Sequence, residues 1–423
     1  MIGAIAIQSI TDTEIVELSN ADADWHRINQ VVGQSESIYL LLPQTTEALA
    51  QIVKQAAQQQ WRILICGNAT KINWGRITNN IQLVVSTQKC DRLIEHAVDD
   101  LTVTVEAGMK LLDLQEKLRS HNQFLPIDIN YADASLGGIV ATADTGSWRQ
   151  RYGGVRDLLL GLSFIRDDGE VAKAGGRVVK NVAGYDLMKL FTGAYGTLGI
   201  MTQLTFRTYP LINTSQTLLL IGKAENIAQA TQTIRNSGLT PAAMDLLSNT
   251  LVKQLDLGSD LGLIIRWQTI PESIEQQINQ VKAIAQQLDL EHNIYADELE
   301  KKLWQDCTNI INTSHETVTA KIAIAPAAAV DFLARFNQQS TLARIHASSG
   351  LGRIQLSAEY EQIAEMRSYC QQNYGFLTIL DAPEAVKQNI DVWGYSGNAL
   401  KTMQALKSQF DPQNIFNPGR FVV

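Results

Sequence analysis

Cysteine is scarce in this chain, and its few cysteines stand far apart. The 423 residues contain only Cys66, Cys90, Cys307 and Cys370, and no two of them form a C-x-x-C pair. Iron–sulfur clusters and zinc ribbons need closely spaced cysteine ligands, so we expect neither of them here. Scattered free thiols are typical of a reducing compartment, which predicts a cytoplasmic protein.

Basic runs and long apolar runs are also missing. The formal net charge is −8, whereas nucleic-acid binding needs a basic surface, so no nucleic-acid partner is expected. No uncharged apolar stretch of about 18 residues occurs, which predicts no transmembrane segment. The opening residues MIGAIAIQSITDTE have no basic segment, and we interpret them as a strand or arm rather than a signal peptide. Any membrane association would then be peripheral and made through partner proteins.

The distribution of glycine divides the chain. Thirteen of its 28 glycines lie within residues 131–200, whereas glycine becomes sparse from about residue 213. The length is typical of two or three domains, and beyond residue 213 we infer a second domain. Apolar spacing and turn residues predict several elements in both parts. They are a helix over 43–60 that begins at Thr45 or Thr46, a strand over 61–66, a helix over 109–121, a hairpin over 157–175, helices over 225–238 and 272–288, and strands over 217–224, 261–268 and 319–326.

The first of three notable loops is CGNATKINWG, residues 66–75, which follows a short apolar strand. Consecutive backbone N–H groups in such a loop can bind an anion such as a pyrophosphate. Thr70 adds a hydroxyl donor and Lys71 a positive charge. A plain strand-to-helix turn explains the same residues equally well. The loop matches neither the Walker pattern nor G-x-G-x-x-G.

The other two loops are richer in small residues. In ADASLGGIVATADTGSWRQRYGG, residues 132–154, Gly137 and Gly138 lead into a helix of small residues that can lie flat against a planar ligand. Arg151, Tyr152 and Arg156 are candidates to flank it, and close helix–sheet packing is the structural alternative. In RVVKNVAGYDLMKLFTGAYGTLGI, residues 177–200, glycine recurs in an apolar stretch. Such glycines indicate close backbone approach or a positive φ angle.

These loops resemble one family in sequence and in order. Two further segments share the resemblance: RYGGVRDLLLG and the tail FDPQNIFNPGRF, residues 410–421. The family is the FAD-binding, PCMH-type oxidoreductases of the vanillyl-alcohol-oxidase superfold, and within it the glycolate oxidase or dehydrogenase E-subunit group. The resemblance is strong over 38–212 and 395–423. It implies an α+β fold with an N-terminal arm (1–37), a two-subdomain FAD-binding domain (38–212), an α+β cap domain (213–400), and a C-terminal segment (401–423) that packs on the FAD domain.

The resemblance also implies which residues bind FAD. Residues 67–71 would cradle the pyrophosphate, and Asn417 would reach the isoalloxazine side from the tail. Some relatives bind the flavin covalently through a histidine in the first loop. None lies between residues 62 and 80, so we expect non-covalent FAD. The full implied set is Gly67, Asn68, Ala69, Thr70, Lys71, Trp74, Ala134, Ser135, Gly137, Gly138, Ala141, Thr142, Gly146, Tyr152, Lys180, Gly184, Tyr185, Gly196, Ile200 and Asn417.

One motif departs from the family pattern. Catalytic 2-hydroxyacid dehydrogenases of this group carry H-A-G-D-G-N-L-H, whose histidines bind a metal. This chain has HASSGLGR, where His346 remains but Ser349 and Arg353 replace the acidic residue and the second histidine. Arginine stays protonated and does not ligate metals, so we expect no metal. Arg353 and Lys321 are candidates for holding a substrate carboxylate, and His346 for taking a hydroxyl proton. The structural alternatives, which the sequence slightly favours, are a capped strand end for His346 and a surface ion pair for Arg353.

The resemblance implies oxidation of glycolate, or a similar small 2-hydroxyacid, by an FAD-dependent dehydrogenase. Its family complex contains a catalytic flavoprotein subunit and an iron–sulfur subunit, which would be the partners of this chain. An alternative is a non-catalytic flavoprotein that serves assembly or electron relay in that complex, and the altered HASSGLGR motif favours it. A third possibility is an NADPH-dependent reductase of peptidoglycan precursors on the same superfold, although nothing in the sequence indicates a nicotinamide site.

Overall fold

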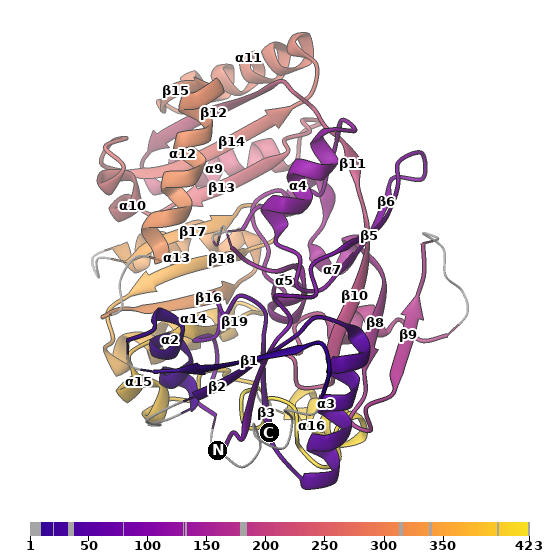
Figure 1. The fold of residues 1–423 in the computed structure, drawn as a ribbon. Coiled ribbons are helices and arrows are strands. Elements are labelled where there is room, and N and C mark those ends of the chain that lie inside the picture. The colour runs from indigo at the N-terminus through magenta and orange to yellow at the C-terminus, as the bar shows by residue number, and fades with distance from the viewer. Residues whose placement is uncertain are drawn as a thin grey trace. The chain divides into compact units, whose positions relative to one another are not determined.

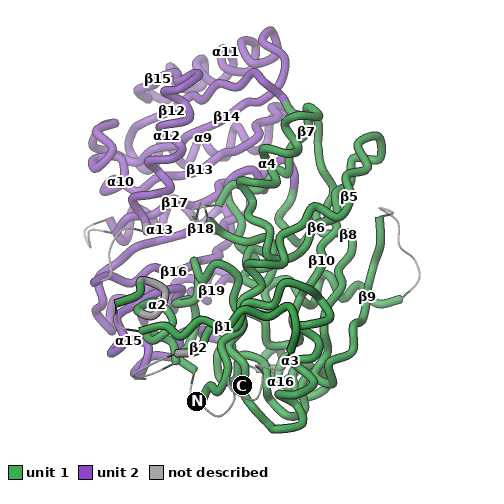
Figure 2. Tube along the Cα trace, viewed as in Figure 1, with its two compact units in different colours: residues 1–146, 153–211, 395–423 green, residues 147–152, 212–394 purple. Residues whose placement is uncertain are grey.

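The fold is described here from a computed structural model (Figure 1). It describes residues 10–421 except positions 20, 33–37, 79, 130, 132, 178–183, 313–315, 338–340 and 396. Of the predicted N-terminal arm over 1–37, residues 1–9, 20 and 33–37 lie outside this set, and so does Lys180. The chain forms two compact units, shown in separate colours in Figure 2. Unit 1 comprises residues 1–146, 153–211 and 395–423, and unit 2 comprises 147–152 and 212–394.

The first sheet of unit 1 mixes parallel and antiparallel strands. Its elements are β1 (Thr13–Leu18), α2 (Ala23–Val32), β2 (Ile38–Pro43), α3 (Thr46–Gln59), β3 (Ile63–Cys66) and β4 (Leu83–Ser86). The strand order is β1-β2-β4-β3, and β4 runs parallel to both of its neighbours. Helix α3 begins where Thr45 accepts a hydrogen bond from the Ala48 amide, as the sequence predicted. Its Leu49, Ile52 and Val53 are buried against this sheet, because they recur at helical spacing.

The second sheet of unit 1 is antiparallel, in the order β5-β6-β10-β8-β9. Its strands and the elements around it are β5 (Leu93–Ala97), β6 (Thr102–Glu106), α4 (Leu111–Arg119), β7 (Gln123–Phe124), α5 (Leu136–Thr142), α7 (Val155–Leu158), β8 (Leu159–Ile165), β9 (Val171–Gly175), α8 (Leu187–Phe191), β10 (Ile200–Arg207) and β11 (Tyr209–Pro210). The predicted hairpin is confirmed as β8 and β9. Short helix α5 packs its apolar residues into the core of this half.

The C-terminal segment joins the first sheet of unit 1. After α16 (Gly397–Phe410), the Ile63 amide donates to the Ile415 carbonyl at 2.7 Å. The carboxylate of Asp411 accepts from the amides of Ile415 and Phe416 at 2.9 and 2.8 Å. Buried Lys407 donates to Asp411 and to the Thr197 carbonyl. These bonds fix residues 411–417 against strand β3, so the tail becomes part of the unit 1 core.

Unit 2 is built on one antiparallel sheet of eight strands, in the order β15-β12-β14-β13-β17-β18-β16-β19. Its elements are α6 (Arg149–Tyr152), β12 (Ser215–Gly222), α9 (Ala224–Arg235), β13 (Ala243–Leu247), α10 (Asn249–Gln254), β14 (Leu261–Gln268), α11 (Pro271–Gln287), β15 (Glu291–Ala296), α12 (Asp297–Asn309), η1 (Ile310–Asn312), β16 (Val318–Ala323), η2 (Pro326–Ala328), α13 (Ala329–Arg335), β17 (Leu342–His346), β18 (Leu351–Leu356), α14 (Tyr360–Gln372), β19 (Phe376–Asp381) and α15 (Glu384–Asn389). Antiparallel sheets with separate helices confirm the predicted α+β class.

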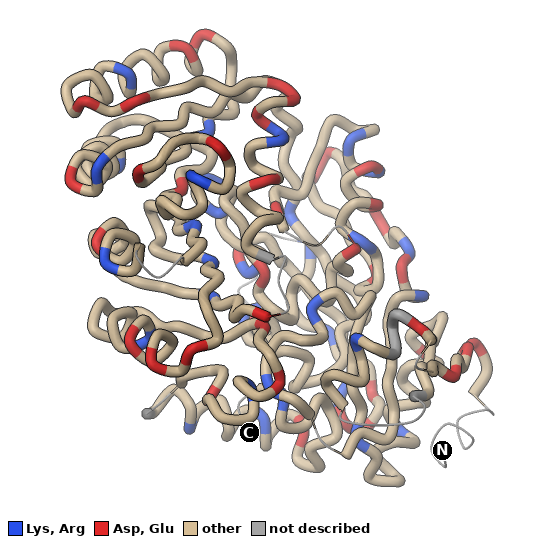
Figure 3. Tube along the Cα trace, turned by 90° about the vertical axis from the view of Figure 1, so that its left-hand side faces the viewer, with Lys and Arg blue, Asp and Glu red and all other residues tan. Residues whose placement is uncertain are grey.

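The two faces of the unit 2 sheet differ in chemistry. Successive side chains of a strand point to opposite faces, and directly opposed residues share a face. One face carries Leu246 opposite Ile345, and Ala343 opposite Ile354. The other face, called the polar face below, carries the charged residues Asp245, Arg344 and Arg353 together with His346, beside the apolar Leu247 and Leu342. In the described part of the chain, Lys and Arg are interspersed with Asp and Glu (Figure 3).

Candidate functional site

The loop that follows β3 takes a conformation that requires small residues. A Cβ atom on Gly67 would stand 2.0 Å from the Ser135 hydroxyl oxygen, so a larger residue is excluded. Ala69 has a φ of +54°, in the left-handed region. The Asn68 side chain donates to the Asp133 carbonyl at 2.7 Å and ties the loop to the start of α5. The first glycine-containing loop is therefore held directly against the second.

Helix α5 begins at Ser135, whose hydroxyl accepts from the Gly138 amide at 3.3 Å. Gly137 packs on the backbone of Ala107, where a Cβ would approach the Ala107 carbonyl oxygen to 2.9 Å. The Thr142 hydroxyl donates to the Gly138 carbonyl at 2.7 Å. This confirms the predicted loop that leads into a helix of small residues.

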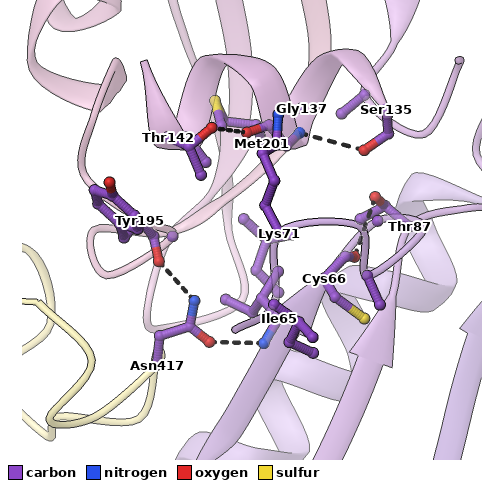
Figure 4. A pocket seen from close by; sticks show the side chains of 18 of the residues that line it. Ile65, Cys66, Lys71, Thr87, Ser135, Gly137, Thr142, Tyr195, Met201 and Asn417 are labelled. Atoms are coloured by element: carbon purple, nitrogen blue, oxygen red, sulfur yellow. Dashed lines mark hydrogen bonds between the residues drawn. The ribbon is translucent and has the colours of Figure 1, made fainter. Parts of the chain in front are cut away.

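The third glycine-rich loop meets the tail at Asn417. Tyr195 and Gly196 have φ angles of +53° and +69°. A Cβ on Gly196 would lie 2.7 Å from the Asn417 side-chain nitrogen. Figure 4 shows Asn417 reaching both Tyr195 and Ile65 with its side-chain amide. The amide thus links the third loop, strand β3 and the tail at one point.

Together these segments line a partly open cavity within unit 1 (Figure 4). Thirteen of the residues implied by the resemblance line it. They are Gly67, Asn68, Ala69, Thr70, Lys71, Ser135, Gly137, Gly138, Ala141, Thr142, Gly196, Ile200 and Asn417.

The remaining implied positions lie elsewhere in the structure. Trp74 and Ala134 are buried beside the cavity-lining loops but do not line the cavity. Tyr152 belongs to unit 2, and the Tyr185 side chain is 89% exposed. Gly146, whose Cβ would collide with Asp128, and Gly184, with a φ of +92°, also lie outside the lining.

Sequence reasoning missed nine lining residues. Cys66 ends β3, and Thr87 and Ala107 directly follow β4 and β6; no local pattern reveals the register of these strands. Arg420 lies in the tail segment, close to Asn417. The missed residues are Ile65, Cys66, Ile72, Thr87, Ala107, Tyr195, Gly199, Met201 and Arg420. The tail motif itself was a usable signal for Arg420, because a basic residue three positions after Asn417 shares its turn.

Two buried cations stand at the cavity wall. Lys71 Nζ lies 3.1 Å from the Asp144 carboxylate, and both side chains are buried. Its charge is therefore balanced within the protein, although Lys71 was predicted to face a phosphate. Arg420 donates to the carbonyls of Lys71 and Ile72. Burial lowers the pKa of Arg420 to about 10, so it remains a cation at neutral pH. Arg420 thereby fixes the end of the first loop.

A second polar cluster lies in unit 2, around His346 at the end of β17. Its Nδ1 lies 2.7 Å from Oδ1 of Asp245, the opposed residue on β13. Asp245 is 0% exposed. Burial alone would raise the pKa of the Asp245 carboxyl, but His346, Arg344 and Ser147 outweigh it and lower that pKa. Asp245 is thus held as a carboxylate.

The two other predicted substrate-binding residues adjoin this cluster through the sheet register. Arg353 on β18 is opposed to Arg344 on one side and to Lys321 on the other. Three cations therefore occupy one row on the polar face, next to His346. Within the described ranges, no group of three His, Cys, Asp or Glu residues is placed to hold a metal ion.

Matches to known families cover two of the three loops that build the cavity, and the tail. Residues 38–175 match the family described as FAD binding domain, and residues 393–421 match FAD linked oxidases, C-terminal domain. The first match contains the loops at 66–75 and 132–154. The second contains Asn417 and Arg420. Among the described helices, none is long and apolar enough to cross a membrane.

Several curated proteins are similar to this chain. Glycolate oxidase subunit GlcD of Bacillus subtilis is 24% identical over 92% of this chain and 89% of its own length. Glycolate oxidase subunit GlcE of Escherichia coli is 34% identical, over 39% of this chain and 47% of its own. Other relatives are named dehydrogenases of D-lactate and D-2-hydroxyglutarate.

Solved structures show the same fold. That of p-cresol methylhydroxylase with substrate bound matches with a TM-score of 0.74 over 99% of this chain and 95% of its own, at 14% identity. The cavity residues fit the cofactor of the matching domain. Gly67 and Gly196 let the loops pack closely against Ser135 and Asn417, and loop amides and hydroxyls supply donors around the cavity.

Proposed function

We propose, on the premise that the chain belongs to the FAD-binding PCMH-type oxidoreductases, that it oxidises glycolate or another small 2-hydroxyacid. The observation that carries the proposal is the unit 1 cavity, closed by three glycine-containing loops and by Asn417 of the tail. Similarity to glycolate oxidase subunits and to dehydrogenases of D-lactate and D-2-hydroxyglutarate supports this substrate class.

FAD would be held in this cavity without a covalent bond. Residues 67–71 would meet the pyrophosphate through amides and the Thr70 hydroxyl, and α5 would lie along the flavin. Arg420, fixed behind the first loop, would add positive charge near the anionic part of the cofactor. Non-covalent binding follows from the absence of histidine between residues 62 and 80. Acid precipitation of the loaded protein should leave all flavin in the supernatant.

FAD, when bound, supplies the acceptor for the hydride that leaves the substrate α-carbon. The chain's own residues would supply position and proton transfer. Arg353 and Lys321 lie opposite each other on β18 and β16, which suits binding of one carboxylate by two cations. His346 would take the hydroxyl proton, so that a 2-hydroxyacid loses a hydride and a proton and becomes a 2-oxoacid.

Two partner subunits would complete the electron path. The four cysteines of this chain are dispersed, so an iron–sulfur carrier must come from another chain. We propose a complex with a catalytic flavoprotein subunit and an iron–sulfur subunit. The two relatives that are glycolate oxidase subunits support an assembly of several subunits.

A second candidate is a non-catalytic flavoprotein subunit in the same complex. It is favoured by Arg353, which stands where the family's metal motif has a histidine. Replacing Arg353 with Met separates the two candidates. A catalytic subunit predicts a roughly tenfold or greater rise in KM for glycolate, since a charged hydrogen bond to the carboxylate is lost. Unchanged turnover of the whole complex would contradict the substrate-binding role. Arg335→Met is the control, because Arg335 pairs with Glu365 on the surface.

A further inference from the structure

A buried carboxylate stands directly behind the histidine of the HASSGLGR motif. Asp245 lies in the middle of β13, and His346 ends β17, and the two are opposed residues in neighbouring strands. His346 Nδ1 lies 2.7 Å from Asp245 Oδ1. The His346 side chain keeps 12% of its surface exposed, whereas Asp245 has none. One end of the imidazole is therefore fixed inside unit 2.

The other carboxylate oxygen is also occupied. The Ser147 hydroxyl donates to Asp245 Oδ2 at 2.5 Å. Arg344 Nε lies 3.7 Å from the same oxygen, while Arg344 Nη1 donates to Thr308 at 2.7 Å. Ser147 belongs to the short segment 147–152, which joins unit 2 although the residues on both sides belong to unit 1. Three side chains thus hold the carboxylate, two from β17 and one from segment 147–152.

The hydrogen-bond donors available to Asp245 and His346 determine which imidazole nitrogen carries the proton. An ionised carboxylate only accepts hydrogen bonds, so the proton between Asp245 and His346 resides on Nδ1. In the neutral ring the lone pair must then lie on Nε2, because a neutral imidazole carries one N–H. A base for a substrate hydroxyl needs that lone pair on an accessible atom.

We propose that Asp245 is a positioning residue that holds His346 as the Nδ1–H tautomer, with Nε2 available as the proton acceptor. Ser147 and Arg344 keep the carboxylate in place. The inference rests on the proposed function, because it assigns His346 a proton-transfer role. It names no contact between Asp245 and substrate.

The charged groups around the pair come from several elements. Arg344 shares β17, Arg353 and Lys321 continue the row on β18 and β16, and Cys307 faces the pair from α12. The pH profile of kcat for any variant therefore has to be compared with that of the wild type at the same ionic strength.

The test combines a spectroscopic signature with kinetics on the FAD-loaded chain in its complex. Nitrogen-15 NMR of histidine-labelled protein distinguishes the two tautomers, and His346→Gln assigns the signal. The proposal expects an Nδ1–H signal in wild type that is lost or mixed in Asp245→Asn. It also expects Asp245→Asn to lower kcat for glycolate by on the order of 10²-fold with little change in KM.

Glu300→Gln is the matched control. Glu300 is another buried carboxylate of unit 2, held by Ser215, Thr217 and Arg266 rather than by histidine. It should leave both the His346 signal and the kcat unchanged. A wild-type Nε2–H tautomer, or a signal unmoved in Asp245→Asn, would overturn the inference. Full activity of His346→Gln would instead contradict the catalytic role of His346. The tautomer measurement would still show whether Asp245 holds His346 in the Nδ1–H form.

Discussion

The side chain of Asn417 donates to the carbonyl oxygen of Tyr195 at 2.7 Å, across 222 positions of sequence. Its oxygen accepts from the Ile65 amide, also at 2.7 Å. Asn417 reaches this position with a φ of +44°, in the left-handed region that asparagine tolerates better than most residues. One amide therefore connects three cavity-lining segments, and the C-terminal tail forms part of the wall.

Replacing Asn417 with Ala should weaken both the fold and the cavity. Two buried hydrogen bonds are lost and their partners are left unsatisfied, so we expect a loss of about 2 kcal/mol in the free energy of unfolding. FAD affinity should fall by roughly tenfold or more, because the third loop loses its anchor. Asn417→Asp keeps the acceptor for Ile65 but loses the donor to Tyr195. Its stability and FAD affinity should therefore lie between those of the wild type and of Asn417→Ala. Urea unfolding and FAD titration measure both effects. Wild-type FAD affinity in both variants would contradict the linking role.

The two glycines of α5 should respond differently to alanine. At Gly137 a Cβ would press on the Ala107 carbonyl at 2.9 Å, and backbone yields poorly, so Gly137→Ala should lose about 1–3 kcal/mol of stability. At Gly138 the nearest atom is the Ser135 hydroxyl at 3.1 Å, and the residue lines the cavity. Gly138→Ala should keep its melting temperature within a few degrees and weaken FAD binding. Equal stability losses in the two variants, with unchanged FAD affinity, would show that α5 serves packing alone.

Thiol reactivity should single out Cys66. Burial raises the pKa of Cys90, Cys307 and Cys370 to about 12, so these thiols are almost entirely protonated at pH 8. Cys66 is half-buried and lines the cavity. A disulfide reagent such as DTNB should therefore label about one thiol per native chain, and FAD should slow that labelling. Cys66→Ser serves as the control. Labelling of the native protein that persists in Cys66→Ser would contradict the assignment.

The ionised Asp245 carboxylate should stabilise the folded chain at neutral pH, and this contribution should be lost only at low pH. Its pKa is lowered from 3.8 in the folded chain, so its contribution is fully present above 3.8 and is lost as the pH falls through the lower folded value. Asp245→Asn breaks a buried charge network and should cost about 3–5 kcal/mol at pH 7. Urea unfolding at several pH values should show this difference retained down to about pH 5. A difference that has already vanished at pH 5 would mean that Asp245 is not held as a carboxylate.

Local patterns predicted the local structure well. Helical spacing and Thr45 predicted α3, and apolar spacing with turn residues predicted the hairpin of β8 and β9. Clustered glycines indicated backbone approach, and the cavity lies where their loops meet. These features depend on residues close in sequence, so a single chain reveals them.

Local sequence patterns did not predict the contacts between residues that are far apart in the chain. Arg420 packs on the carbonyls of Lys71 and Ile72, nearly 350 positions earlier, and Asp245 pairs with His346 across 101 positions. Neither pairing has a local signal, because strand order and register decide which residues meet. The family resemblance supplied Asn417 but not these partners. It also implied Tyr185, whose side chain is exposed in the structure.

The measurement that tests the central claim most directly is the visible absorption spectrum of the purified, FAD-reconstituted chain before and after anaerobic addition of glycolate. The account predicts stoichiometric flavin bands that bleach with glycolate, and slower bleaching or none in His346→Gln. D-lactate and D-2-hydroxyglutarate, run in parallel, define the substrate within the class. Flavin bands that none of these acids bleaches, in the chain alone and in the assembled complex, would contradict it.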